Sequence, residues 1–517
     1  MAYMTPRRLT FRTIPLPLAD SRDITGSVAS RVFLSLFNDA PTATWLDSSG
    51  NGGAISVLAN SAGPLARTWL PQVASSAEFF AQLRSAFAEP VEIPAEWPCD
   101  FALGWVGALG YGIEDIARSR EDHPDAALLF ADRAVVVDHE RAVAHAMALL
   151  PGVDGPPQKA REVHAKQLEW LDATVVAVQD IADDVSGPVL GSAPVATLGG
   201  TLSTDCAPTD YAATFHFDQP KQQYLASIQR CLDYIAAGDS YEVCLTNTAR
   251  GPALRNLAAL GASEQSSRQS PAAATGSASP ELLAYLRLRE VSPVPYGAFL
   301  RFSRPGAAPL HILSASPERF LKVSPAGAVS AKPIKGTRPR GKDQAADARG
   351  RQELQSNPKD RAENLMIVDL LRNDLGRVCV PGSVEVPKIF SVETFSHVHQ
   401  LVSTITGRLR AGLGAVDAIE ASYPGGSMTG APKIRTMQII EELEPQPRGF
   451  YSGAIGWISP NSAAELNITI RTLIDDGKEC SFGVGGAIVA DSDPLAEYQE
   501  TLVKAAALLD TLGGQIA

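Results

Sequence analysis

The sequence lacks several features that are typical of membrane and secreted proteins. No apolar run among its 517 residues approaches the ~18 residues that a membrane-spanning helix needs. The residues up to Pro17 contain three arginines but no apolar segment, so we expect no secretory signal. The six cysteines form no Cys-x-x-Cys pair, and we interpret them as free thiols, most of them buried. These absences predict a cytoplasmic protein.

An excess of basic charge is also missing. The chain has 45 Lys and Arg against 57 Asp and Glu, which gives a formal net charge of −12. Nucleic acids and anionic membranes bind basic surfaces, so this charge argues against both as partners. Hydrophobic residues make up 45% of the chain, which is enough to bury a sizeable core.

The pattern of composition divides the chain into three parts. Residues 1–185 alternate strand-like runs with loops and end in a segment of helical spacing from Gln158 to Asp184. Residues 186–218 are rich in Gly, Ser, Pro and Ala, which predicts a linker. Residues 219–517 carry most of the helix and strand signals, interrupted by a polar insertion at about 252–280.

Two segments of the third part have the start signals of helices. Asn357 can cap the first segment and Pro358 suits its first turn. We predict an apolar stripe of Leu365, Val368, Leu371 and Leu375 on this helix, with Gly376 just after its end. Asp360 and Glu363 lie three residues apart and therefore share a face.

The C-terminal helix is predicted to begin in the same way. Asp493 can cap it and Pro494 can occupy its first position, and Glu497, Glu500 and Lys504 then lie on one face. Two helices that present carboxylates could together hold a divalent cation such as magnesium. From spacing alone, two solvated helix faces are the more common explanation.

A series of strings gives a more specific interpretation, because together they resemble the chorismate-binding family. This family contains the anthranilate synthase large subunit, aminodeoxychorismate synthase component I, and the isochorismate and salicylate synthases. The resemblance is carried, in order, by Ser316-Pro-Glu-Arg-Phe320, Pro333-Ile-Lys-Gly-Thr337, Glu363 to Asp374, His397 to Ser403, Tyr423-Pro-Gly-Gly-Ser-Met-Thr-Gly-Ala-Pro-Lys433, Gly449-Phe-Tyr-Ser-Gly-Ala-Ile-Gly456, Asn467 to Thr472, Gly485 to Ser492 and Glu497-Tyr-Gln-Glu-Thr501.

The resemblance implies an α+β fold in which large antiparallel sheets pack as a sandwich with helices outside. It also implies a magnesium ion that bridges a carboxylate of chorismate, held by Glu363 and Glu500 with Glu497 nearby. Asp360 is then expected to be solvated, or to contact the metal ligands rather than the metal itself.

For the substrate, the resemblance assigns Arg471 to the pyruvyl carboxylate, which a guanidinium fork matches. Tyr451 can add a hydroxyl donor. Gly485 and Gly486 suit a close approach of ligand to backbone, although a strand bulge explains such glycines equally well. Ala487 stands where the family often has glycine. The remaining residues expected at the substrate are Gly336, Thr337 and Lys504.

Glu318 and Lys335 match the positions that carry the chemistry in the family. Glu318 corresponds to the general acid and must be protonated, so its pKa should be raised. Lys335 stands where aminodeoxychorismate synthases typically carry lysine and anthranilate synthases alanine. As a nucleophile it must be neutral, so we expect burial to lower its pKa. A lysine that only pairs with a substrate carboxylate is the alternative.

The implied reaction is the amination of chorismate to 4-amino-4-deoxychorismate, which feeds 4-aminobenzoate and folate synthesis. Alternatives are an anthranilate synthase component I and a catalytically inactive homologue. Isochorismate and salicylate synthases use a lysine near the position of Glu242, so a water-activating enzyme is disfavoured. No cysteine lies in the Gly-x-Cys-x-Gly setting of a glutaminase, which predicts a separate glutamine amidotransferase subunit as the ammonia source.

Two further assignments stay open at this stage. Ser48, Pro295 and Tyr296 lie in strings that resemble a tryptophan pocket of the family. Anthranilate synthases tend to have histidine at the position of Gln400, whereas this chain has His399 one residue earlier. Adjacent residues of a strand face opposite sides, so His399 cannot simply take that role.

Overall fold

Alternation of side chains along the strands places two different cores on the two faces of one sheet. In β12 (Tyr296–Arg304), Ala298, Leu300 and Phe302 are buried against one core, whereas Phe299 is buried in the other. This follows from the two-residue period of a strand. The structure, a computed structural model, describes residues 6–17, 28–48, 54–120, 122–152, 157–184, 213–257, 278–395 and 398–517.

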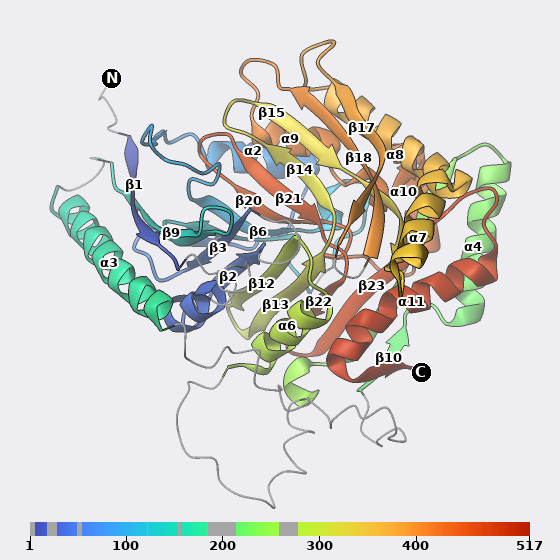
Figure 1. Ribbon diagram of the computed structural model, residues 1–517, viewed down its shortest axis with the longest axis horizontal. Coiled ribbons are helices and arrows are strands. Elements are labelled where there is room, and N and C mark those ends of the chain that lie inside the picture. Colours follow the sequence, from blue (N-terminus) through green and yellow to red (C-terminus); the bar gives the residue numbers. More distant parts are fainter. Residues whose placement is uncertain are drawn as a thin grey trace, which may run out of the picture.

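Among the described residues, the larger sheet has 14 strands, which come from both ends and the middle of the chain (Figure 1). In spatial order they are β24 (Gly514–Ile516), β10 (Ala213–Phe217), β11 (Glu242–Pro252), β23 (Glu479–Ile488), β22 (Thr472–Asp475), β13 (Ala307–Ser316), β12, β2 (Ala43–Asp47), β3 (Ile55–Asn60), β8 (Arg133–Asp138), β9 (Val143–Leu150), β1 (Arg7–Pro15) and β5 (Val91–Glu92), with β19 (Gly430–Ala431) beside β11.

The second sheet has 10 strands in the part of the chain that the structure describes. Their order is β16 (Ile334–Pro339), β18 (Val398–Arg408), β15 (Ala328–Lys332), β14 (Arg319–Val323), β21 (Ala464–Ile468), β20 (Ala454–Ile458), β6 (Gly104–Leu109), β7 (Ala126–Ala131) and β4 (Arg67–Trp69), with β17 (Glu385–Thr394) beside β18. Apart from the parallel pairs β1–β5 and β10–β24, the described pairs are antiparallel, as expected from the resemblance.

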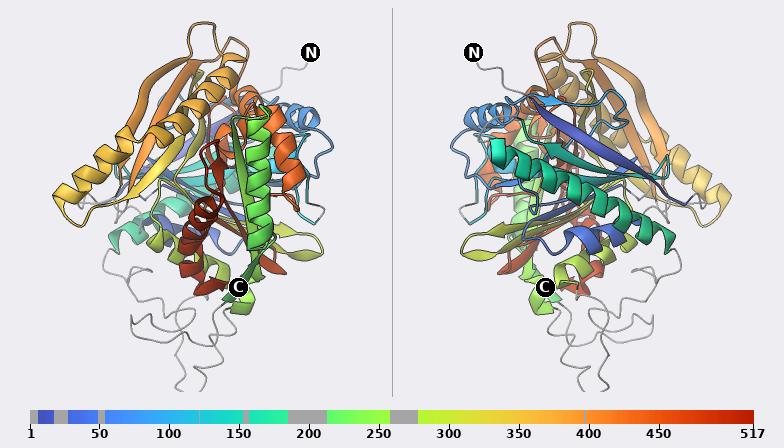
Figure 2. Two further views of the ribbon diagram at one scale, coloured as in Figure 1. Left: turned by 90° about the vertical axis from the view of Figure 1, so that its right-hand side faces the viewer. Right: turned by 90° about the vertical axis from the view of Figure 1, so that its left-hand side faces the viewer.

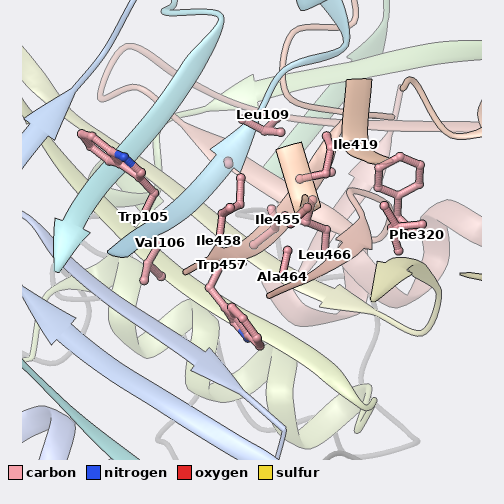
Figure 3. Close-up of a cluster of buried hydrophobic side chains, with 14 of the residues drawn as sticks. Trp105, Val106, Leu109, Phe320, Ile419, Ile455, Trp457, Ile458, Ala464 and Leu466 are labelled. Carbon is pink, nitrogen blue, oxygen red and sulfur yellow. The ribbon is translucent and has the colours of Figure 1, made fainter. Parts of the chain in front are cut away.

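The main core lies between the two sheets. Figure 3 shows part of it, where Trp105 and Val106 of β6 and Trp457 and Ile458 of β20 are buried together. Full burial of such apolar side chains stabilises the fold by about 1.5–3 kcal/mol each. Gly107 is needed where β6 pairs with β7, because a Cβ atom there would lie 2.0 Å from the Ala127 carbonyl oxygen.

Helices cover the outer faces of the sheets, and α3 runs across one side of the molecule (Figure 2). The second core contains residues of α3, α6 and α11 packed on the larger sheet. The described helices are α2 (Ser76–Ser85), α3 (Pro157–Asp183), α4 (Lys221–Ala236), α6 (Pro280–Val291), α7 (Gln344–Ser356), α8 (Pro358–Gly376), α9 (Ala415–Ser422), α10 (Lys433–Leu443) and α11 (Pro494–Leu512), with the short turns η1 (Phe33–Phe37), η2 (Tyr111–Ile113) and η3 (Gly426–Met428). No helix of the described ranges is both long and apolar enough to cross a bilayer.

The predicted caps of α8 and α11 are confirmed. The Asn357 side chain accepts from the Asp360 N–H, and the Asp493 side chain accepts from the Ala496 N–H. The apolar stripe of α8 is partly wrong, because Leu365 is 44% exposed and Ile367 is buried instead. Gly376 is the last residue of the helix rather than the residue after it.

The two predicted halves of the chain share both sheets. In the larger sheet β2 pairs with β12, and in the smaller one β6 pairs with β20. Most of the predicted linker and most of the predicted insertion lie outside the described residues, although β10 occupies residues 213–217. The described cysteines are free thiols, four of them buried and Cys99 partly exposed.

Candidate active site

A cavity of about 800 Å³ opens between β16, β23, α8 and α11. It brings together side chains that are far apart in the sequence. Every residue expected to act on substrate or metal lines it: Glu318, Lys335, Gly336, Thr337, Glu363, Tyr451, Arg471, Gly485, Gly486, Ala487, Glu497, Glu500 and Lys504.

Lys335 forms a buried ion pair with Glu242, a residue of β11. Its Nζ atom lies 2.6 Å from Glu242 Oε1, and the side chains are 10% and 0% exposed. Burial alone would lower the pKa of Lys335, but the fields of Glu242 and Glu363 outweigh it and raise the pKa above its ordinary value. The expected lowered pKa of Lys335 is therefore wrong. The other oxygen, Glu242 Oε2, is buried without a hydrogen-bond partner.

Glu318 has the environment that a general acid needs. The side chain is 6% exposed, and burial raises its pKa to about 7. A hydrogen bond from Ser427 and the positive field of Lys335 oppose this rise. The carboxyl group can therefore hold a proton near neutral pH, as the sequence predicted.

Three carboxylates and two lysines face one another between α8 and α11. Lys359 Nζ lies 3.1 Å from Glu497 Oε1 and 3.9 Å from Glu363 Oε1, and Lys504 Nζ lies 2.8 Å from Glu500 Oε1. Burial raises the pKa of Glu363 to about 7, because removal of the carboxyl group from water disfavours its charged form. Oxygen donors in excess negative charge suit a hard divalent cation such as magnesium.

Asp360, which neighbours this group, is engaged elsewhere. Its Oδ2 accepts from Arg338 Nη2 at 2.8 Å. It also packs against Gly336, which has a φ of +90°, and a Cβ atom there would lie 2.8 Å from Asp360 Cγ. A glycine is therefore required directly after Lys335 so that β16 can approach α8.

Arg471 is a cation without a carboxylate partner among the described residues. Burial lowers the pKa of its guanidinium, and no described anion counteracts this effect. Its backbone φ is +49°, a conformation that side chains rarely adopt and that occurs at ligand-binding sites. Tyr451 lines the same cavity and packs against Gly483 of β23. The cavity thus offers a charged donor to an anionic ligand.

Gly485 and Gly486 of β23 serve different purposes. A Cβ atom at Gly485 would lie 2.3 Å from the Leu245 carbonyl oxygen, so packing on β11 requires this glycine. A Cβ atom at Gly486 would instead lie 3.3 Å from Glu497 Oε2 and 3.9 Å from Lys504 Nζ. Gly486 therefore borders the charged part of the cavity, and its missing side chain leaves room there. Lys504 also donates to the Gly485 carbonyl oxygen at 2.8 Å.

Gln400 and His399 face opposite sides of β18, as the strand period predicts. Gln400 lines the cavity and its Oε1 is buried without a partner. His399 is hydrogen-bonded to Thr394 and lies 3.0 Å from Asp347 of α7. Gln400 is thus an additional candidate for a substrate contact, whereas His399 supports the fold.

A buried ion pair behind the cavity was not predicted from the sequence. Arg448 Nη2 lies 2.7 Å from Glu444 Oε1, and both side chains are buried. Glu444 accepts from the backbone and hydroxyl of Thr246, and Arg448 donates to the carbonyl oxygens of Cys244 and Met428. The pair therefore joins β11 to the loop that carries Ser427.

The three residues of the possible tryptophan pocket lie close together in the fold. Gly297 pairs with Asp47, so Tyr296 and Ser48 lie at the same end of β12 and β2. Of the three, only Pro295 lines the large cavity, while the ring of Tyr296 lies 5.9 Å from the Arg319 guanidinium. Tryptophan binding at this place stays a prediction.

Comparisons with known proteins agree with the geometry. Residues 42–276 and 265–510 match the family described as chorismate binding enzyme. An aminodeoxychorismate synthase of Streptomyces griseus is 42% identical over 530 residues, which cover 98% of this chain and 65% of that protein. The chain therefore spans less than two thirds of this relative. Aminodeoxychorismate synthase component 1 of Klebsiella aerogenes is 37% identical over 80% of this chain and 78% of its own length.

A solved structure supports the same grouping. The crystal structure of anthranilate synthase component I from Streptococcus pneumoniae matches with a TM-score of 0.64 at 26% identity. The match covers 89% of this chain and 93% of that one. The chain is a member of the chorismate-binding enzyme family.

Proposed function

We propose that the protein catalyses the magnesium-dependent amination of chorismate with ammonia, giving 4-amino-4-deoxychorismate. The observation that carries this proposal is the position of Lys335. It lies on the wall of the cavity in contact with Glu242, and its charge influences both Glu318 and Glu363. Relatives named aminodeoxychorismate synthase support the choice of product.

The substrate dianion would bind at two places in the cavity. One is the group of carboxylates that would hold the metal, and the other is the guanidinium of Arg471. Glu363, Glu500 and Glu497 would hold the metal, and a bound magnesium ion would neutralise a carboxylate of chorismate and polarise its ring. Arg471 would bind the pyruvyl carboxylate, which provides the counter-ion that this guanidinium lacks among the described residues. Gly336, Thr337, Tyr451, Lys504 and the backbone of 485–487 complete the substrate contacts in this proposal.

The chemical step then needs two proton movements. Lys335 passes a proton to Glu242, and the neutral amine attacks C2 of the ring while the C4 hydroxyl takes the Glu318 proton and leaves as water. Ammonia next attacks C4 and displaces the Lys335 amine from C2. The new C4 ammonium loses one proton, which restores Glu318, and the released lysine recovers its proton from Glu242.

Ammonia is the co-substrate, and we expect a glutaminase to supply it. A relative named component 1 implies a second component, which fits a separate glutamine amidotransferase subunit. Within a cell we place the reaction in the cytoplasm, as a supplier of 4-aminobenzoate for folate synthesis.

The proposal is tested by identifying the product. The protein is incubated with chorismate, magnesium and an ammonium salt, and the product is analysed by mass spectrometry. We expect 4-amino-4-deoxychorismate, which becomes 4-aminobenzoate only after addition of a lyase. Anthranilate and pyruvate would instead identify an anthranilate synthase, and glutamine-dependent activity without a partner would exclude the separate glutaminase.

A further inference from the structure

A second group of metal-binding side chains lies outside the active site. Glu281 at the start of α6, His311 of β13 and Asp475 of β22 offer ligand atoms within 4.8 Å of one another. Their exposed fractions are 7%, 5% and 0%. His311 and Asp475 are direct cross-strand neighbours, so the sheet fixes two of the three ligands next to each other.

The group carries more negative than positive charge in a place without solvent. Arg301 pairs with His311 in the register of β12 and β13, and the field of Glu281 acts on its guanidinium. The guanidinium donates to the carbonyl oxygens of Asn38 and Ala40. Asp475 accepts from the backbone N–H groups of Leu254 and Gly477. Neither buried carboxylate forms an ion pair among the described residues, which is costly unless protons or a metal compensate.

The imidazole of His311 supplies a second, independent observation. Its Nδ1 atom is buried and forms no hydrogen bond. Burial lowers the pKa of His311 to about 4 and raises the pKa of Asp475 to about 6. The imidazole is therefore neutral at physiological pH, which is the form that binds metal ions.

We propose that Glu281, His311 and Asp475 form a structural site for a divalent transition-metal ion of the zinc class. Imidazole together with carboxylate oxygens suits zinc, whereas magnesium and calcium prefer oxygen alone. Zinc binds both donor types at about 2.0–2.2 Å, so small side-chain rotations bring the three atoms to one ion.

A second group of this kind, which contains Asp122, His123 and Asp476, serves as a comparison. His123 and Asp476 form a hydrogen bond of 3.2 Å, and Asp476 also accepts from the backbone N–H groups of Lys478 and Glu479. No buried nitrogen of His123 is left without a partner. Asp475 likewise accepts from two backbone N–H groups, so the two groups differ in the imidazole: His311 has a buried nitrogen without a partner and His123 has none.

The site would fasten α6 to the larger sheet at the end away from the active-site cavity. Glu281 lies in the first turn of α6, while Val291 at its other end lines that cavity. The two ends are separated by about 15 Å, given the rise of about 1.5 Å per residue. The ion therefore stabilises the fold without contacting substrate.

The test is a zinc titration of the full chain in excess magnesium, read by calorimetry, elemental analysis and the visible spectrum of the cobalt form. We expect one zinc ion per chain and a cobalt spectrum with imidazole ligation. His311→Gln and Glu281→Gln should weaken zinc binding by at least about tenfold. Absence of zinc binding by the unchanged protein would overturn the proposal.

Two control variants separate this site from other causes. His145→Gln removes a buried histidine whose Nε2 also lacks a partner but which belongs to no metal-binding group among the described residues, and it should keep the zinc ion. Glu363→Gln, in the active-site cavity, should keep it as well. Unchanged affinity in His311→Gln would contradict the site. If that variant does not fold, the Glu281→Gln titration and the cobalt spectrum of the unchanged protein decide.

Discussion

Lys335 Nζ and Glu242 Oε1 lie 2.6 Å apart on the wall of the cavity, although 93 residues separate them in the chain. The pair holds the lysine as a cation and, in our proposal, also provides the base that removes its proton. In that proposal, the ion pair keeps Lys335 protonated until chorismate binds.

Replacement of Lys335 by alanine should slow amination by roughly 100-fold or more, because the covalent route through C2 is lost. Some anthranilate could then form directly. The measurement is product formation from chorismate and ammonium by mass spectrometry. Lys332→Ala is a matched control, since Lys332 at the end of β15 pairs with Glu393 at 2.7 Å. Unchanged kinetics of Lys335→Ala would remove the nucleophile from the mechanism.

Glu242→Gln should give a rate that rises with pH. The amide cannot accept the lysine proton, so the variant should be about 100-fold slower near pH 7. Loss of the anion also removes the main cause that raises the pKa of Lys335, so more neutral amine forms as the pH increases. The kcat of both proteins is measured against pH. Parallel profiles of the variant and the unchanged protein would show that Glu242 is not the acceptor.

The stability of the metal-free protein should fall as the pH rises towards 8. Burial raises the pKa of Glu363 from 4.5 to about 7, so the protonated form is favoured in the fold. The resulting stability is fully present below pH 4.5 and is lost as the pH rises through about 7. In the presence of a chelator, Glu363→Gln should therefore stabilise the protein at pH 8 by roughly 1–3 kcal/mol and have little effect at pH 4.5.

Thermal unfolding at both pH values, with chelator or with magnesium, measures this effect. Magnesium should stabilise the unchanged protein at pH 8 but not the variant. Glu385→Gln, at an exposed position of β17, is the control and should change neither curve. Equal magnesium stabilisation of Glu363→Gln would exclude Glu363 as a ligand.

Arg471→Lys should raise the KM for chorismate by about 10-fold to 100-fold, because an ammonium cannot form the two parallel hydrogen bonds of a guanidinium. The kcat should change less. Arg319→Lys is the control, since this arginine already has Glu465 as its partner at 3.1 Å. An unchanged KM in Arg471→Lys would mean that the pyruvyl carboxylate binds elsewhere.

Arg448→Met should destabilise the protein by about 3–5 kcal/mol, because it leaves the Glu444 carboxylate buried without its cation. Denaturant unfolding measures this loss. The double variant Arg448→Met with Glu444→Gln should recover part of the stability, since the unpaired charge is then gone. A single variant as stable as the unchanged protein would show that the pair does not support the fold.

Local signals account for what the sequence predicted well. Caps such as Asn357 and Asp493 act within one helical turn, so their residue types suffice to place the starts of α8 and α11. The buried side of α8 depends on what packs against it, and for this reason Leu365 was assigned to the wrong face. The family strings placed the cavity residues, because they carry information on tertiary structure that spacing alone does not.

Long-range pairs account for what was missed. The charge state of Lys335 depends on Glu242. The hydrogen bond of the Thr246 backbone N–H depends on Glu444, which is 198 residues away. No local pattern connects such residues. The orientation of Gln400 follows from the strand period, but its place in the cavity follows only from the packing of β16 on β18.

The interleaving of β2 with β12 and of β6 with β20 has a consequence for how the protein can be made. A fragment that begins after residue 218 would expose the edges of β12 and β20, and open edges pair with other chains. Expression of the C-terminal part alone should therefore give aggregates. Two separately produced halves should form active enzyme only when they fold together, because each sheet contains strands of both halves.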